Sequence, residues 1–282
     1  MTKYLEQIDD YLRYLKIVRG VAETTLRQKN AILHFFGRVT EISDLKNLTN
    51  EVFNKWVYYL SHSNVAPSSI NIYNSIIISM IRYYLEIGLA VPFNTTLITK
   101  MKVQNKARKF YSESDINSVV ELANVEVGLM IRIMFETGMR IAEITRLHVN
   151  NIDGRKITFI GKGRKMREVY ITNKTLGLVR DYINNNHIEG YLWGIYDGVL
   201  TCNGEPPTVN TVRKYLKQAF LRAGFEDFYP HALRHSFATD LQRRGASVAE
   251  IKEMMGHENI ATTERYLHGF DGKLQVLFDK YR

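Results

Sequence analysis

Apolar residues recur at helical spacing through the first hundred residues, and helix start and stop signals divide them into four segments. Gly20 is placed to end the first helix, and Gly37 lies near the end of the second. Thr49, flanked by apolar neighbours, is a candidate N-cap for a third helix. Pro67 introduces a fourth helix, which runs to Gly88. The pattern therefore predicts a compact four-helix unit.

The hydrophobic period changes in the rest of the chain, where helical and strand-like segments are mixed. Ser112 and Asp115 form a capping pattern ahead of one helix, and an apolar helix ends at Gly138. Two short β-type runs, Lys156–Ile160 and Glu168–Ile171, predict a hairpin across a basic, glycine-containing loop. The other helical segments are Ile141–Leu147, Leu176–Ile183, Val209–Ala223, Leu233–Arg243 and Ser247–Met255. The predicted fold class is mainly α with a small antiparallel β-sheet.

The length of 282 residues favours two domains. We expect a helical domain over residues 1–99, a basic linker over 100–110, and a second domain over 111–282 that ends in a tail helix. The linker cations are Lys100, Lys102, Lys106, Arg108 and Lys109. Two compatible interpretations of this segment remain open, a solvated tether and a strap along a phosphate backbone.

Composition excludes several classes of protein. Hydrophobic residues make up 45% and charged residues 24%, as in an ordinary globular protein. The longest apolar run, Ile76–Ile81, is far shorter than the roughly 18 residues that a membrane span needs. Charges among the first ten residues argue against a secretory signal. The only cysteine, Cys202, has no partner for an internal disulfide or a zinc site. We therefore expect a cytoplasmic protein without a metal.

Positive charge gathers in the first third of the chain. The net charge is +9, and residues 1–109 hold 15 basic against 8 acidic residues, or +7. Phosphate contacts supply most of the sequence-independent affinity for nucleic acid, so this distribution favours a DNA- or RNA-binding module over an inert basic surface.

Two weak motifs are incomplete, and a third is absent. The Gly161-Lys162-Gly163 sequence starts a dinucleotide-binding motif, but Met166 stands where its last glycine belongs. His231 and His235 have zinc-helix spacing without the glutamate of that motif, and no Walker sequence is present. Nucleotide hydrolysis and metal chemistry are therefore disfavoured.

A set of phosphate-suited residues lies at predicted element ends. Arg140 follows a helix break, and Glu143 lies three positions later on the same face. His231 and Arg234 have the same spacing, which pairs a proton-exchanging imidazole with a two-donor guanidinium. Each pair on its own is also compatible with an ordinary surface or core role.

The order of these motifs resembles that of the tyrosine recombinases. The matching residues are Arg140 in T-G-M-R-I-A-E-I, Lys162 in the G-K-G hairpin, His231 and Arg234 in H-A-L-R-H, His257 in M-G-H and Tyr266 in R-Y. The resemblance covers essentially the whole chain, and five separated motifs in one order make it specific. Within the family the chain is most similar to the Xer recombinases, which resolve chromosome or plasmid dimers and thereby serve chromosome partition and cell division.

The resemblance implies a role for each of these residues. Tyr266 would attack the scissile phosphate to give a covalent 3′-phosphotyrosine. Arg140 and Arg234 would hold the non-bridging oxygens, with a further hydrogen bond from His257. Lys162 would protonate the leaving 5′-oxygen, and His231 would assist the tyrosine.

Further implications concern orientation, DNA contact and cofactors. Glu143 would orient Arg140, while Arg164 and Lys165 of the hairpin loop would contact DNA. Lys165 is also the alternative to Lys162 as the proton donor. Asp240 stands where relatives often carry another histidine, at a position that we expect to be peripheral. Neither ATP nor any other cofactor is implied.

The expected partner is double-stranded DNA that carries a specific recombination site. The tail stripe of Leu274, Leu277, Phe278 and Tyr281 resembles the helix that family members pass to a neighbouring subunit in a tetramer. Folding back on its own domain is the alternative for the tail. For the whole protein, the alternatives to an Xer-like, nucleoid-associated recombinase are a viral or mobile-element integrase, a type IB topoisomerase and a non-catalytic DNA-binding regulator. An accessory protein is also possible.

Overall fold

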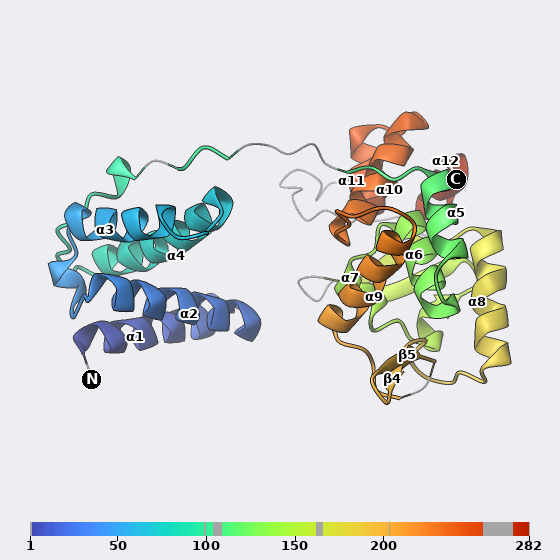
Figure 1. Cartoon of the computed structure of the whole chain (residues 1–282), viewed down its shortest axis with the longest axis horizontal. Helices are drawn as coiled ribbons and strands as arrows, with labels where there is room; N and C mark the ends of the chain where they lie inside the picture. Colours follow the sequence, from blue (N-terminus) through green and yellow to red (C-terminus); the bar gives the residue numbers. More distant parts are fainter. Residues whose placement is uncertain are drawn as a thin grey trace. The chain divides into compact units, whose positions relative to one another are not determined.

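Residues 2–98, 100–103, 109–161, 166–202, 204–255 and 273–281 are described by the computed structural model of the chain. They belong to two compact units, Met1–Lys106 and Ala107–Arg282, each with its own hydrophobic core (Figure 1). The division falls within the segment that the sequence predicts as a linker.

Four helices form the first unit, as the sequence predicts. They are α1 (Lys3–Ile17), α2 (Glu23–Thr40), α3 (Asn50–Ser61) and α4 (Pro67–Glu86), with single 3₁₀ turns at Leu45–Asn47 and Thr95–Leu97. The core is aromatic: Trp56 is fully buried and its indole N–H donates to Asn74 Oδ1 at 3.0 Å. A hydrogen-bonded Trp fixes how α3 and α4 pack, because its single polar atom needs a partner when it is buried.

Thr49 and Gly37 were predicted to mark helix ends in this unit, and the structure shows what each residue contacts. Thr49 is the N-cap of α3, where its hydroxyl accepts from the Val52 N–H at 3.3 Å, as predicted. Gly37 lies near the end of α2, as predicted, and the helix continues to Thr40. A Cβ at residue 37 would lie 2.7 Å from the ring of Tyr4, so this glycine serves close packing between α1 and α2.

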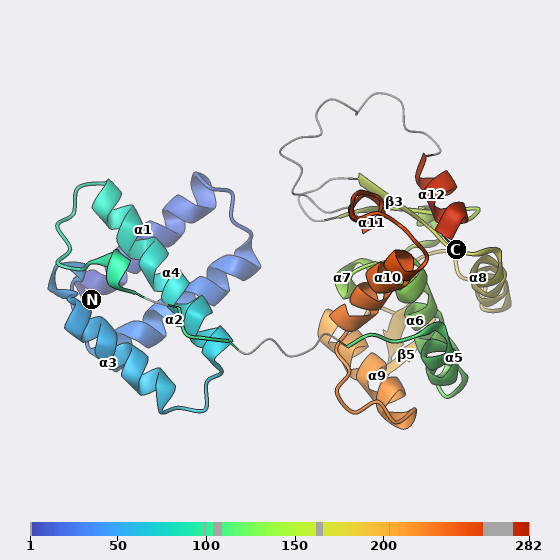
Figure 2. The same ribbon diagram turned by 90° about the horizontal axis from the view of Figure 1, so that it is seen from above.

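The second unit combines helices with two small antiparallel sheets. Its helices are α5 (Glu113–Glu121), α6 (Val125–Thr137), α7 (Ile141–Ile144), α8 (Asn173–Asn185), α9 (Val209–Arg222), α10 (His231–Arg243), α11 (Val248–Met255) and α12 (Lys273–Tyr281). α6 lies at the centre and packs against α5, α8, α9 and α10 (Figure 2). The predicted fold class, mainly α with a small antiparallel sheet, is confirmed.

The larger sheet contains the predicted hairpin. β1 (Ile152–Asp153), β2 (Lys156–Ile160) and β3 (Met166–Tyr170) lie in that order, and Ile160 pairs with Met166 at the end nearest the connecting loop. A second hairpin of β4 (Gly194–Tyr196) and β5 (Val199–Thr201) was not predicted.

Helix ends in the second unit follow the sequence closely. Ser112 and Asp115 form the predicted reciprocal capping box at the start of α5. Gly138 ends α6 in the left-handed region, with φ of +65°. The predicted helix Ile141–Leu147 is shorter than expected, because α7 ends at Ile144.

The tail helix α12 packs on its own unit, against β3 and α11. Leu277, Phe278 and Tyr281 are buried there, in a cluster that also contains Met255. The Tyr281 hydroxyl donates to Glu250, whose hydrogen bonds from Ser247 lower its pKa to about 2. Within the described ranges, no helix is both long and apolar enough to cross a membrane.

Candidate active site

Arg140 and Glu143 form a closed pair at the start of α7. Arg140 occupies the N-cap position, and its backbone N–H donates to Glu143 Oε2 at 2.7 Å. Its guanidinium Nη1 donates to the other carboxylate oxygen, Oε1, at 2.9 Å. The pairing that the three-residue spacing predicts is therefore present. Glu143 is nearly buried, whereas about a third of the Arg140 side chain remains exposed to solvent.

Arg234 lies one turn into α10 and is among the most deeply buried charged residues described, with 2% of its surface exposed. Its Nη1 donates to the carbonyl of Gly138, and its Nη2 donates to the carbonyl of Met255 at 2.6 Å. The Gly138 carbonyl is reachable because α10 and α6 pack very closely there: a Cβ at residue 138 would lie 2.6 Å from the Phe237 ring. The end of α6 and the end of α11 thus fix one guanidinium.

Arg167 is a third arginine at this site, and none of the sequence motifs includes it. It comes from β3, and its Nη1 donates to Glu143 Oε1 at 3.2 Å. Its Nη2 donates to the Met255 carbonyl at 2.6 Å. The only sequence signal for Arg167 was the alternation of side chains along β3. It places Arg167 on the same face of the strand as Val169, but it does not show which helices pack against that face.

Two guanidinium groups, those of Arg140 and Arg167, therefore share the Glu143 carboxylate, and the carboxylate also acts electrostatically on Arg234. Burial, with Arg140 and Arg167 as like charges nearby, lowers the pKa of Arg234 to about 10, although Glu143 acts in the opposite direction. Burial also lowers the pKa of Arg167. An anion beside Arg140 and Arg234 would relieve this excess of positive charge, and a phosphate has the oxygen geometry that arginine forks bind.

The remaining predicted site residues divide into two groups. His231 is described: it is the first residue of α10, one turn before Arg234, and its surface is exposed. The others lie outside the described residues; they are Lys162, Arg164, Lys165, His257 and Tyr266. Met255, the last described residue before His257 and Tyr266, presents its carbonyl to the arginine cluster.

A metal site has no candidate ligand set in the part of the chain that the structure describes. No group of three or more His, Cys, Asp or Glu side chains is placed to hold an ion among those residues.

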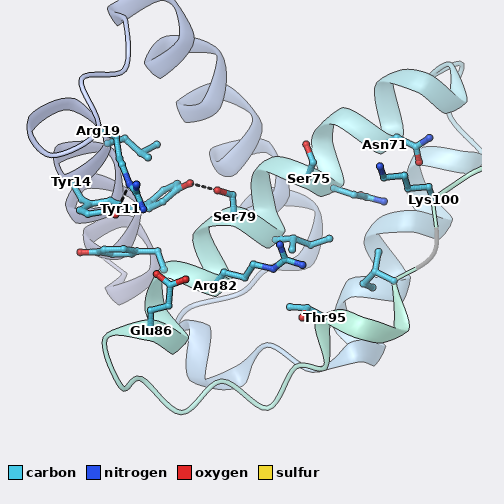
Figure 3. A pocket seen from close by; sticks show the side chains of 15 residues that line it. Tyr11, Tyr14, Arg19, Asn71, Ser75, Ser79, Arg82, Glu86, Thr95 and Lys100 are labelled. Atoms are coloured by element: carbon cyan, nitrogen blue, oxygen red, sulfur yellow. Dashed lines mark hydrogen bonds between the residues drawn. The ribbon is translucent and has the colours of Figure 1, made fainter. Parts of the chain in front are cut away.

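The first unit carries a pocket of about 410 Å³ between α1, α4 and the segment that follows the Thr95–Leu97 turn. Arg19, Arg82 and Lys100 line it together with one acid, Glu86 (Figure 3). Tyrosines form its inner wall, where Tyr11 donates to Ser79 Oγ at 2.8 Å and Tyr14 stacks on Tyr83 at 4.5 Å. We call this the cationic groove.

The described linker cations occupy two different settings. Lys100 lies in the cationic groove, and the neighbouring residue Met101 is tied to α4 by two hydrogen bonds with the Asn71 side chain, at 2.8 and 3.0 Å. Lys102 is exposed beside it. Lys109 belongs to the second unit and pairs with Asp227 at 3.0 Å. Lys106 and Arg108 lie outside the described residues.

Comparison with known proteins identifies relatives over nearly the full length. A model of the phage integrase family matches residues 103–272. A protein named tyrosine recombinase XerD from Staphylococcus haemolyticus is 25% identical over 288 residues, which cover 97% of either chain. A tyrosine recombinase from Thermosipho africanus is 28% identical over 291 residues, which cover 96% of either chain.

Solved structures share the fold. A lambda integrase tetramer bound to a Holliday junction is 15% identical with a TM-score of 0.72, over 94% of this chain and 80% of that one. The Tn1549 transposon integrase in complex with circular intermediate DNA is 16% identical with a TM-score of 0.72, over 100% of this chain and 95% of that one.

Proposed function

This chain belongs to the phage integrase family of tyrosine recombinases, and from that premise we propose that it exchanges DNA strands at a specific site through a covalent 3′-phosphotyrosine and a Holliday junction. The observation that carries the proposal is the arginine cluster: Arg140 and Arg234, far apart in sequence, belong to one cationic site. Arg167 links them, because it shares Glu143 with Arg140 and the Met255 carbonyl with Arg234. A phosphodiester is the anion that fits both this site and the family.

The proposed reaction is a phosphoryl transfer to Tyr266. Its phenolic oxygen bonds to phosphorus while the bond to the 5′-oxygen of the next nucleotide breaks. His231 assists the loss of the phenolic proton, and Lys162 protonates the departing 5′-oxygen. A 5′-hydroxyl from the partner duplex then reverses the reaction and releases the tyrosine. Each step exchanges one phosphoester for another, so the bond energy is retained and no ATP is needed.

Arg140, Arg234 and His257 stabilise the transition state by donating to the non-bridging oxygens. Buried donors that are already held in place contribute most, because they need no reorganisation when charge develops. The contacts of Arg234 support this role, since two of its acceptors are backbone carbonyls that are fixed by helix ends.

The proposal is tested by formation of a covalent complex. Wild-type protein is incubated with DNA that carries the site, without metal or ATP, and denaturing gels report protein linked to a 3′ end. Tyr266→Phe should bind DNA and form no adduct, while the matched control Tyr191→Phe should form it normally. An adduct that persists in Tyr266→Phe would show that another residue is the nucleophile.

Lys162 is tested separately through its leaving group. Lys162→Ala should slow cleavage of normal DNA, and replacing the leaving 5′-oxygen by sulfur should restore the rate, because a thiolate departs without a proton. Lys165→Ala serves as the comparison: any defect it shows should remain with the sulfur substrate. The opposite pattern would assign proton donation to Lys165.

We propose that the first unit grips the DNA backbone through the cationic groove. Arg19, Arg82 and Lys100 outnumber the single acid of the groove, and this unit holds most of the net charge of the chain. The tyrosines add apolar surface for packing against sugar.

We propose that subunits assemble by exchanging the tail helix. α12 packs against β3 and α11 of its own unit, and in a tetramer it would pack against the same surface of a neighbouring subunit. A chain truncated before Phe270 should bind a single half-site normally but lose cooperative assembly on a full site, as measured by gel shift. Full cooperativity of the truncated chain would exclude tail exchange.

Among the biological roles, the full-length resemblance to proteins named XerD favours dimer resolution. A plasmid with two directly repeated sites should be resolved into two circles by the purified protein, alone or with an accessory protein from the host. Recovery of element–chromosome junctions in place of resolved circles would favour a mobile-element integrase.

A further inference from the structure

Arg167 makes both of its described side-chain hydrogen bonds to acceptors that it shares with another arginine. Glu143 Oε1 accepts from Arg167 at 3.2 Å and from Arg140 at 2.9 Å. The Met255 carbonyl accepts from Arg167 and from Arg234, both at 2.6 Å. Arg167 therefore stands between the two arginines that the proposed function assigns to the phosphate.

Its position is more constrained than a simple ion pair requires. Only 11% of the side chain is exposed, and the guanidinium lies 5.3 Å from the centre of the Phe159 ring. A ring beneath a guanidinium fixes the plane of the fork, which a lysine ammonium does not have. The two donors can therefore hold two acceptors at a set separation.

A stabilising role alone accounts poorly for this arrangement. Burying a third cation beside two others carries a desolvation cost, and a well-packed apolar side chain in its place would often be as stable. An apolar residue could not, however, join Glu143 to the end of α11.

The end of α11 matters because the next part of the chain carries the proposed nucleophile. Met255 is the last residue of α11, and His257 and Tyr266 come after it in sequence. Carbonyls in the last turn of a helix lack intrahelical partners and attract cations, so two guanidinium groups on one such carbonyl fix where the helix ends.

We propose that Arg167 is a positioning residue, which holds the Glu143 carboxylate and the Met255 carbonyl at a fixed separation and so fixes the end of α11, the helix that precedes the proposed nucleophile in sequence, relative to Arg140. This inference rests on the proposed function. It assigns to Arg167 no contact with the phosphate itself.

The first test separates a rate effect from a folding effect. Arg167→Met, Arg167→Lys and the control Arg132→Met, which removes a part-buried guanidinium from α6, are compared in single-turnover cleavage of a nicked substrate. We expect Arg167→Met to lower the cleavage rate constant about 100-fold, the loss typical of a misplacement of about 1 Å. DNA affinity should stay within about threefold of wild type, because the phosphate contacts are unchanged. Arg167→Lys should recover part of the rate, and Arg132→Met should match wild type.

A purely structural role gives a different pattern. Loss of folded protein lowers the amplitude of cleavage and leaves the rate constant of the surviving fraction unchanged. That result, or a wild-type rate constant in Arg167→Met, would overturn the inference. Should Arg167→Met fail to fold, Arg167→Lys provides the same separation of amplitude from rate.

The second test does not require activity. Hydrogen–deuterium exchange of the α11 peptide should be faster in Arg167→Met than in wild type, whereas Arg132→Met should leave α11 unchanged. Unchanged exchange in Arg167→Met would refute the positioning role even if the enzyme is active. If wild type forms no covalent adduct on its site, the proposed function fails, and faster exchange would still support the link between Arg167 and α11.

Discussion

The two units of the chain hold their arginines in opposite ways. In the second unit, Arg234 is buried and Arg167 is largely buried, and every described donor contact of the two ends on a carbonyl or on Glu143. In the first unit, the arginines of the cationic groove line an open pocket, and Arg19 contacts only the ring and hydroxyl of Tyr14 among the contacts described.

The difference separates two uses of the same side chain. Buried guanidiniums lose their water during folding, so they meet developing charge without further rearrangement. Exposed guanidiniums keep their water and are screened by salt, so they add affinity that is the same at every stage of a reaction. We expect the buried set to control rate and the exposed set to control binding, and four substitutions test this division.

Arg234→Ala should have the largest effect. Loss of a preorganised donor costs about 1,000-fold in rate, and we expect at least that loss in single-turnover cleavage. Affinity for DNA should change only several-fold, as measured by gel shift at fixed salt. Equal losses in rate and affinity would contradict the proposed division between buried and exposed arginines, because Arg234 would then act as an ordinary binding residue.

Glu143→Gln should have the next largest effect. It removes the negative charge that Arg140 and Arg167 share and that also acts on Arg234, so repulsion among the three guanidiniums rises and the pKa values of Arg167 and Arg234 fall further. We expect cleavage to slow about 10- to 100-fold. Added sulfate should raise the melting temperature of this variant more than that of wild type, because an anion replaces the missing charge. An equal response to sulfate would contradict a shared carboxylate.

Gly138→Ala tests the close packing of α6 against α10, which places the Gly138 carbonyl beside Arg234. The left-handed φ and the approach of Phe237 should together destabilise the protein by about 2 kcal/mol, measured by urea unfolding. Gly177→Ala is the matched control, since it lies within α8 with no atom within 4 Å of the added Cβ. It should be neutral or slightly stabilising, because alanine favours a helix.

Arg82→Ala should have the smallest effect, and it should change DNA affinity rather than the cleavage rate. We expect DNA affinity to fall several-fold and the slope of log affinity against log salt to shrink by about 1, as for one lost phosphate contact. The cleavage rate constant at saturating protein should not change. Lys55→Ala, on α3 beside Glu51 and outside the groove, should alter neither quantity. A slower rate constant in Arg82→Ala would show that exposed arginines also control the rate, and it would contradict the division between the two groups of arginines.

Local signals in the sequence predicted elements well wherever the deciding contact lies within a few residues. Thr49, Ser112 and Gly138 are such cases, because capping and left-handed helix ends depend on immediate neighbours. Gly37 indicates the end of α2 only approximately, because the contact that requires a glycine there is with Tyr4 on another helix. The β4–β5 hairpin could have been found from its Asp197-Gly198 turn, where both residues have positive φ.

The candidate site was predictable in part. The spacing of Arg140 and Glu143 was enough to predict their pairing, and the motif order grouped Arg234 with them. Arg167 could not be found, because its role depends on which face of β3 meets α7 and α11. The Met255 carbonyl was equally hidden, since no side-chain motif reveals a backbone acceptor.

That acceptor has a consequence for how the protein can change over generations. Every amino acid carries a main-chain carbonyl, so no missense codon at position 255 can delete the oxygen that Arg167 and Arg234 share. The side chain at 255 faces elsewhere, into the apolar cluster beneath α12. Substitutions at this codon therefore change the apolar surface on which α12 packs, whereas the carbonyl acceptor is retained.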